Sequence, residues 1–187
     1  MRIPTGESVG RPPAGRPTAG FGPEVEVTLN DLHEYRGSDL LDLDAARTLD
    51  LTRDFEKWPR EQQTLWLQDN GVDLMLDHLD QWGLVTPHGN RVKLVRVDHP
   101  LWEQPSLEQL GRELSRPHPR VQTRVRLDIT IYLLGIDATP PLTFAFQTAN
   151  GARGLLQLTR LTEQPNSARL RLKVATTSAE APVECRQ

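Results

Sequence analysis

Residues 142–161, LTFAFQTANGARGLLQLTRL, constrain the fold of this chain more than any other segment. Phenylalanine and leucine alternate with small or polar residues on either side of an Asn150-Gly151 pair. Asn-Gly between alternating apolar residues is the strongest short-range signal for a β-hairpin, because both residues tolerate positive φ. The segment therefore predicts antiparallel strands, and it contains no nucleophile motif, metal-ligand cluster or phosphate-binding loop.

Two further segments with a period of two extend this hairpin into a sheet. Apolar residues alternate with polar ones from Val121 to Leu133, and again from Arg169 to Val174, where Arg171 and Lys173 are among the polar ones. Such alternation is typical of strands with one apolar and one polar face. We therefore expect residues 121–176 to form a four-stranded antiparallel meander.

The first half of the chain adds N-terminal strands and two short helices. Residues 24–30 alternate as a strand, and residues 38–51 indicate a small hairpin with its carboxylates on the outer face. A proline start and an Asn-Gly stop bound a helix over 59–69, and a capping box begins another over 106–115. Because amphipathic helices and a one-sided apolar sheet bury each other, we expect an α+β fold in which these helices cover the sheet.

The middle of the chain has a weaker pattern. Residues 72–79 are apolar enough for a buried strand or a further helix, and Gly83 is expected to end that region. A short apolar run fits either structure, so both alternatives stay open. Residues 91–97 indicate another strand after a turn.

Length and composition predict one domain with tails. A chain of 187 residues can build one good core, but its hydrophobic fraction of 37 % is below the usual globular share. Glycine and proline dominate the first residues, and such a segment cannot bury enough surface to offset its ordering entropy. We expect a disordered tail over 1–22, one α+β domain over 23–176 and a second tail over 177–187.

Charge and hydropathy exclude several partner classes. With 22 basic and 25 acidic residues and a net charge of −3, the chain lacks the basic footprint of a nucleic-acid binder. No apolar run approaches the roughly 20 residues that span a bilayer, so we expect a soluble chain without direct membrane insertion. The single cysteine, Cys185, excludes a disulfide within the chain and leaves the compartment unknown.

Aspartate and histidine residues in the first half are candidates for a metal or acid–base site. The aspartates are Asp39, Asp42, Asp44 and Asp50, and the histidines are His78, His88 and His99. Carboxylates in a D-x-D pair can hold Mg²⁺ or Ca²⁺, but the spacing fits neither an EF-hand nor a zinc site. We therefore assign no catalytic residue, metal ligand or cofactor, and keep a small metal-assisted hydrolase using Asp and His residues from 39–99 as the alternative.

Tryptophan and arginine side chains are better candidates for a binding surface. Two tryptophans lie beside turn residues, where aromatic rings can anchor a partner. Arginines on the polar faces of two predicted strands can bind an anion or an acidic partner. The candidate partner-binding residues are Trp82, Trp102, Arg124, Arg126, Arg169 and Arg171. We expect their partner to be another protein or a second copy of this chain.

Four short motifs follow one another over most of residues 19–161. They are Ala19-Gly20-Phe21-Gly22-Pro23, Leu41-Asp42-Leu43-Asp44, Asp69-Asn70-Gly71-Val72-Asp73, and Phe144-x-Phe-x-Thr-Ala-x-Gly151 followed by Gly154-x-Leu-Gln-Leu158. In these motifs the chain resembles a module of large, multi-part bacterial proteins of the planctomycete type, some of which carry a BlaR1-type membrane metallopeptidase. The resemblance implies a non-catalytic, extracytoplasmic accessory domain, since the peptidase's His-Glu-x-x-His motif is not in this sequence.

These observations together predict a non-enzymatic α+β module. Its expected role is protein–protein interaction or ligand sensing in a larger bacterial assembly or regulatory system.

Overall fold

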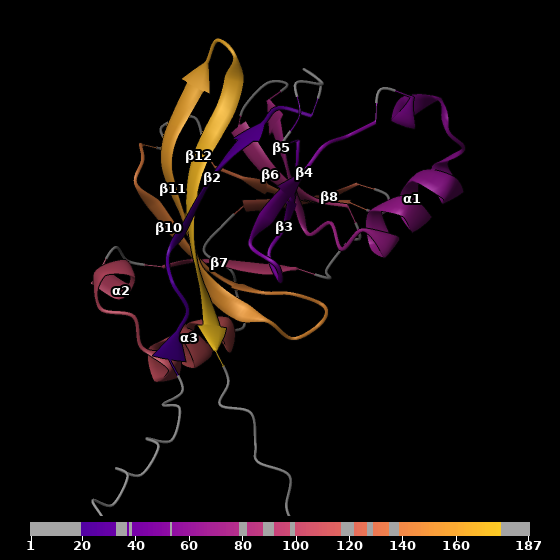
Figure 1. Ribbon diagram of the computed structural model, residues 1–187. Coiled ribbons are helices and arrows are strands. Elements are labelled where there is room, and N and C mark those ends of the chain that lie inside the picture. Colours follow the sequence, from indigo (N-terminus) through magenta and orange to yellow (C-terminus); the bar gives the residue numbers. More distant parts are fainter. Residues whose placement is uncertain are drawn as a thin grey trace, which may run out of the picture.

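The computed structural model shows two antiparallel sheets packed face to face, with short helices on their outer sides (Figure 1). It describes residues 20–32, 37, 39–52, 54–78, 82–87, 92–97, 100–116, 122–126, 129–134 and 139–176. For residues 122–126, 129, 130 and 133 it describes the backbone alone. The predicted α+β class is confirmed. Among the described residues, no helix is long and apolar enough to cross a membrane.

The first sheet contains the hairpin predicted from residues 142–161. Its strands follow the order β1-β12-β11-β10-β7, and β2 also pairs with β12. Their bounds are β1 Gly20–Phe21, β2 Val25–Asn30, β7 Lys93–Val97, β10 Leu142–Gln147, β11 Arg153–Glu163 and β12 Asn166–Thr176. Because β1 pairs with β12, Gly20–Phe21 do not belong to the predicted tail over 1–22. The rest of that tail up to residue 19, and the tail over 177–187, lie outside the described residues.

The second sheet has the strand order β4-β3-β5-β6-β9-β8. Its bounds are β3 Leu40–Asp42, β4 Arg47–Leu49, β5 Leu74–His78, β6 Trp82–Thr86, β8 Gln122–Arg126 and β9 Ile129–Leu133. The predicted meander over 121–176 is therefore correct for β10, β11 and β12 and wrong for its first strand. Residues 122–133 form the hairpin β8–β9, which pairs with β6 in the second sheet. Alternation shows which residues share a face, but not where the chain reverses or which sheet it joins.

The weakly patterned middle of the chain forms two strands of the second sheet. Residues 72–79 give β5 instead of a helix, and Gly83 lies inside β6 instead of ending the region. A Cβ atom at Gly83 would lie 3.0 Å from Cγ2 of Ile131 on the neighbouring β9. The glycine therefore marks a close approach between two strands.

The main core lies between the two sheets. It combines Phe144, Phe146, Leu156, Leu170 and Leu172 from the first sheet with Leu41, Leu74, Leu76 and Leu84 from the second. Packing is tightest at Gly154, where a Cβ atom would come within 2.5 Å of the Lys173 carbonyl oxygen and 2.6 Å of the Phe146 ring. One face of the first sheet is therefore buried against the second sheet, and helices cover only its other face.

Each helix pair covers the outer side of a different sheet. Helices α2, Pro100–Glu103, and α3, Leu107–Leu114, pack on the first sheet, whereas α1, Arg60–Asp69, and the 3-10 helix η1, Phe55–Lys57, pack on the second. The predicted N-cap of α3 is confirmed, since Ser106 Oγ accepts a hydrogen bond from the Gln109 N–H at 3.4 Å. The prediction that both helices cover the meander is wrong for residues 59–69, because the second sheet stands between them and the first.

Candidate functional site

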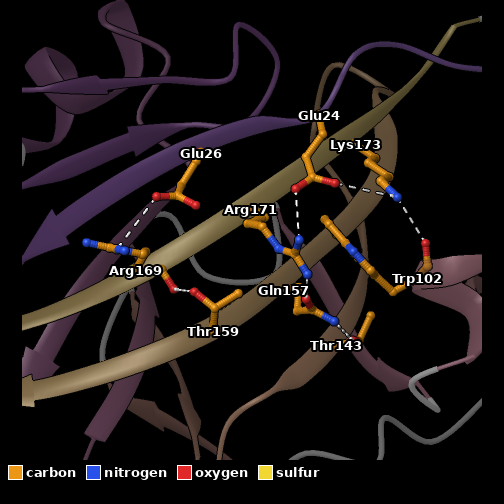
Figure 2. A network of polar contacts seen from close by, with 9 residues as sticks. All are labelled: Glu24, Glu26, Trp102, Thr143, Gln157, Thr159, Arg169, Arg171 and Lys173. Carbon is orange, nitrogen blue, oxygen red and sulfur yellow. Dashed lines mark hydrogen bonds and ion pairs between the residues drawn. The ribbon is translucent and has the colours of Figure 1, made fainter.

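A row of basic side chains occupies the outer face of the first sheet (Figure 2). Arg169, Arg171 and Lys173 alternate along β12 with residues that enter the main core. Arg160 on β11 lies directly across from Arg169. We call these four residues the basic strand face, and its position follows from the period of two that separates core-facing from outward-facing side chains.

Two glutamates neutralise part of this charge. Glu24 places Oε1 3.0 Å from Arg171 Nη1 and Oε2 3.7 Å from Lys173 Nζ, and Glu26 Oε1 is 3.6 Å from Arg169 Nε. The glutamates reach these cations because β2 pairs with β12 in antiparallel register. Among the described residues, four cations on this face thus have two carboxylates beside them, which leaves positive charge on one surface of a chain with a net charge of −3.

The ring of Trp102 supports two of the cations from the α2 side. The Arg171 Cζ atom lies 5.0 Å and the Lys173 Nζ atom 4.4 Å from the ring centre, which are cation–π distances. Lys173 Nζ also donates a hydrogen bond to the Trp102 carbonyl oxygen at 3.0 Å. Trp102 itself is only 1 % exposed, so the expectation that it forms an exposed anchor is wrong. It instead fixes α2 to β12 and holds the two cations in place.

A hydrogen-bonded chain connects Arg171 to the interior of the sheet. Its Nη1 atom donates to Glu24, and its Nη2 atom donates to Gln157 Oε1. Gln157 is fully buried and donates in turn to Thr143 Oγ1 at 3.0 Å. The guanidinium of Arg171 is therefore held by Glu24, just before β2, by Gln157 on β11 and by the ring of Trp102 on α2, with little rotational freedom left to lose when a partner binds.

Arg160 and Arg169 form the least favourable pair on this face. They are direct cross-strand partners beside a β-bulge between Leu158 and Arg160, and both side chains are exposed. Like charges placed opposite each other destabilise a sheet, by roughly 0.2–1 kcal/mol on the scale of cross-strand pairs. Glu26 lies beside Arg169, whereas no ion pair with Arg160 is seen among the described residues. Bulges of this kind re-aim side chains and are frequent next to functional sites.

The other predicted partner-binding residues do not join this face. Trp82 is half-buried on β6 of the second sheet, packs against the main core and stacks on His78 with ring centres 4.2 Å apart. Arg124 and Arg126 lie on β8 at one edge of the second sheet, where the structure describes only their backbone. The structure thus brings together Trp102, Arg169 and Arg171 and keeps Trp82 apart.

Sequence patterns alone missed Arg160 as a member of the face. Counting strand register outward from the Asn150-Gly151 turn would pair β11 with β10, and the β-bulge then shifts the pairing of β11 with β12 by one residue. Without the bulge Arg160 would lie across from Ala168. With it, Arg160 lies across from Arg169. Only the register of the folded hairpin reveals this pair.

Of the four aspartates expected on a solvated strand face and turn, Asp39 and Asp42 are buried, Asp44 is half-buried and Asp50 is exposed. Asp39, Asp42 and Asp73 are at most 8 % exposed. Oxygen atoms of Asp42, Asp44 and Asp73 all lie within 4.8 Å of one another, a spacing that would fit one metal ion. We call these three residues the acidic cluster. The burial of Asp42 and the partial burial of Asp44 correct the prediction of an outer face for these two residues, because the β3–β4 turn packs against the loop between β10 and β11.

Two members of the acidic cluster hold the turn between β3 and β4. Asp73 Oδ2 accepts a hydrogen bond from the Leu43 N–H at 2.8 Å, and Asp42 Oδ1 accepts one from the Ala45 N–H at 2.9 Å. Burial is the main cause that raises the pKa of Asp73 to about 7, and the neighbouring carboxylates add to it. Asp42 also pairs with Arg47 Nε at 3.2 Å.

The third member of the acidic cluster connects the two sheets. Asp44 Oδ1 accepts a hydrogen bond from Thr148 Oγ1 and Oδ2 accepts one from Asn150 Nδ2, each at 2.6 Å. Both donors lie in the loop between β10 and β11, where Gly151 adopts a φ of +89°. The predicted Asn150-Gly151 turn is confirmed, although Gly151 is the one residue of the two with positive φ. The carboxylates of the cluster are thus occupied by donors of the protein itself.

Similarity to known proteins gives no direct guide to this site. No protein-family model matches the sequence, and neither a curated protein nor a solved structure was found to be similar to it. The function must therefore be inferred from the chemistry of the surface.

Proposed function

We propose that this protein is a non-enzymatic binding module whose basic strand face docks an acidic, extended segment of a partner protein. The observation that carries the proposal is the exposed cross-strand pair of Arg160 and Arg169. In the free protein this pair lowers stability. A carboxylate placed between the two guanidinium groups would remove the repulsion and accept hydrogen bonds from both.

The spacing of the face defines the partner segment. Arg169, Arg171 and Lys173 are two residues apart on one strand, which places successive side chains roughly 7 Å apart. An extended peptide repeats its side chains on one face with the same period. We therefore propose a partner with acidic residues at alternate positions, and we expect the planar guanidinium groups to prefer carboxylates in a two-point geometry.

Rigidity of the face supports the same function. Lys173 and Arg171 are fixed by Trp102, and Glu24 leaves part of each cation exposed, with side-chain exposures of 17 % and 30 %. Side chains that are already ordered lose less conformational entropy on binding. Electrostatic attraction between the face and an acidic segment also speeds association.

The direct test is the affinity of the protein for a fluorescein-labelled peptide of alternating glutamate and threonine, measured by fluorescence anisotropy. The Arg160→Glu/Arg169→Glu double variant is expected to weaken binding by about tenfold or more, since a lost charge-assisted contact is worth roughly 1.5–3 kcal/mol. An Arg96→Glu/Arg112→Glu variant changes the net charge equally at exposed positions outside the face and should bind nearly as the wild type does. Equal weakening by both double variants, or no binding by the wild type, would contradict the proposal.

Two earlier expectations stay predictions. A place in a larger bacterial assembly rests on the motif resemblance alone. The metal-assisted hydrolase rests on the acidic cluster, but His88 and His99 lie outside the described residues and His78 stacks on Trp82. Since the cluster carboxylates already accept hydrogen bonds that hold a turn and join the sheets, we favour the binding module.

A further inference from the structure

A cavity of about 250 Å³ lies between α1 and the outer side of the second sheet. From the helix it is lined by Arg60, Gln63, Thr64 and Leu67, whose spacing of i, i+3, i+4 and i+7 places them on one helix face. The rest of the lining is mostly apolar, with Glu56 as its one charged member, and its apolar residues are Leu32, Leu51, Phe55, Met75 and Pro87. The cavity is partly open to solvent, and a concave, mostly apolar site with a few polar groups is typical of small-molecule binding sites.

The helix is held above the cavity by defined contacts. Gln63 Nε2 donates hydrogen bonds to the carbonyl oxygens of Phe55 and Trp58, each at 3.0 Å, which fixes η1 to the first turns of α1. At the other end Leu67 is buried, and its carbonyl oxygen accepts a hydrogen bond from the Val72 N–H at 2.9 Å. The space is therefore built into the fold and does not come from a loosely attached helix.

Aromatic rings reinforce this arrangement on the solvent side. Phe55, Trp58 and Trp66 form a cluster with ring centres 5.5–6.3 Å apart in tilted or edge-to-face geometry. Phe55 belongs both to this cluster and to the cavity wall. The cavity is consequently bounded by a rigid, largely apolar surface, as in preformed small-molecule sites.

We infer that this cavity binds a compact, mostly apolar organic molecule of one or two rings. A dry cavity of about 150 Å³ accommodates benzene, so 250 Å³ corresponds to about ten non-hydrogen atoms. The apolar wall suits the ring system, while Thr64 and Gln63 on the helix side offer polar contacts to a single N–H or hydroxyl group. This inference is independent of the basic strand face, which lies on the other sheet.

Indole is a suitable probe because it has nine non-hydrogen atoms and one N–H group. We would titrate it into the full chain and follow the methyl resonance of Met75, a residue of the cavity wall, by NMR. The expected result is a saturable shift. Thr64→Phe, which fills the cavity from the helix, is expected to weaken this binding by about tenfold or more.

The matched control is Leu65→Ala, because Leu65 is the neighbouring residue on α1 and is 52 % exposed. Truncation of this side chain is expected to leave indole binding unchanged. This result would distinguish binding in the cavity from nonspecific binding to the exposed apolar surface of α1. Leu51→Phe fills the same cavity from the opposite side and replaces Thr64→Phe if that variant does not fold. No saturable shift in the wild type, or equal binding by a folded cavity-filling variant, would overturn the inference.

Discussion

Two charged regions of this protein use their charges in opposite ways. In the acidic cluster of Asp42, Asp44 and Asp73, buried or half-buried carboxylates accept hydrogen bonds from Leu43, Ala45, Thr148 and Asn150. On the basic strand face of Arg160, Arg169, Arg171 and Lys173, the cations outnumber the carboxylates beside them, and two arginines lie opposite each other in solvent.

The difference separates charges that build the fold from charges that remain for a partner. Burying a carboxylate is costly unless donors surround it. Asp42 and Asp44 meet that condition within the chain, whereas burial outweighs the donors at Asp73 and raises its pKa. An exposed pair of like charges brings no such gain to the free protein. The contrast predicts that removing a hydrogen-bond donor to the cluster destabilises the fold, whereas changing the outer arginines affects binding far more than stability.

The largest effect on stability is expected where the basic face meets the helices, at Trp102. Trp102→Ala removes a fully buried ring and both cation–π contacts, so the free energy of unfolding should fall by about 3–5 kcal/mol. Urea denaturation followed by circular dichroism measures this change. Trp58→Ala, at a half-buried position, serves as the control and should cost less. If Trp102→Ala lowers the free energy of unfolding no more than Trp58→Ala does, the ring of Trp102 does not have the stabilising role described here.

A pH dependence is expected from Asp73. Its pKa is about 7 in the folded protein against 3.8 for the free group, so the folded state holds the proton more tightly. Stability from this group is therefore fully present below pH 4 and is lost as the pH rises to 7, on the order of 4 kcal/mol in all.

Asp73→Asn removes this titration while it keeps an oxygen acceptor for the Leu43 N–H. The variant should unfold at higher urea concentration than the wild type at pH 8 and show almost no advantage at pH 4. If the unfolding free energies of the two proteins instead change in parallel with pH across this range, burial does not raise the pKa of Asp73.

A smaller effect is expected at the connection between the sheets. Thr148→Val deletes the hydroxyl that donates to Asp44 at 2.6 Å, which should cost about 1.5–3 kcal/mol because the acceptor is charged and partly buried. Thr159→Val deletes a hydroxyl on the basic side of β11 that donates to the Arg169 carbonyl oxygen in an exposed setting, and should cost less. Thermal unfolding of both variants compares the two regions directly, and equal losses would remove the distinction between them.

Much of the fold could be predicted because apolar and polar residues alternate along the individual strands. The hairpin at Asn150-Gly151, the row of Arg169 and Arg171, and the cap at Ser106 each follow from a local pattern that the structure confirms. The division into two sheets could not be predicted in this way, since a period of two does not specify a strand's neighbours. Residues 121–133 illustrate the limit, because their uninterrupted alternation conceals a reversal of the chain.

The sites were harder to predict because they depend on which surfaces meet. Asp42 and Asp44 alternate with leucines as if they faced water, yet contacts from residues more than 100 positions away enclose Asp44. In the sequence Trp102 lies beside turn residues, which favours an exposed ring. In the structure Arg171 and Lys173 from a distant strand lie over that ring. Such features follow from tertiary packing and register, which local propensities do not encode.

The most direct test of the central claim is to measure stability and acidic-peptide binding in the single variant Arg160→Glu. The substitution replaces a like-charge pair with an opposite-charge pair beside Arg169, so the free energy of unfolding should stay equal or rise by roughly 0.2–1 kcal/mol. Affinity for the alternating glutamate peptide should nevertheless fall by about tenfold, in keeping with a lost charge-assisted contact. A variant that binds the peptide as tightly as the wild type would contradict the role of the basic strand face.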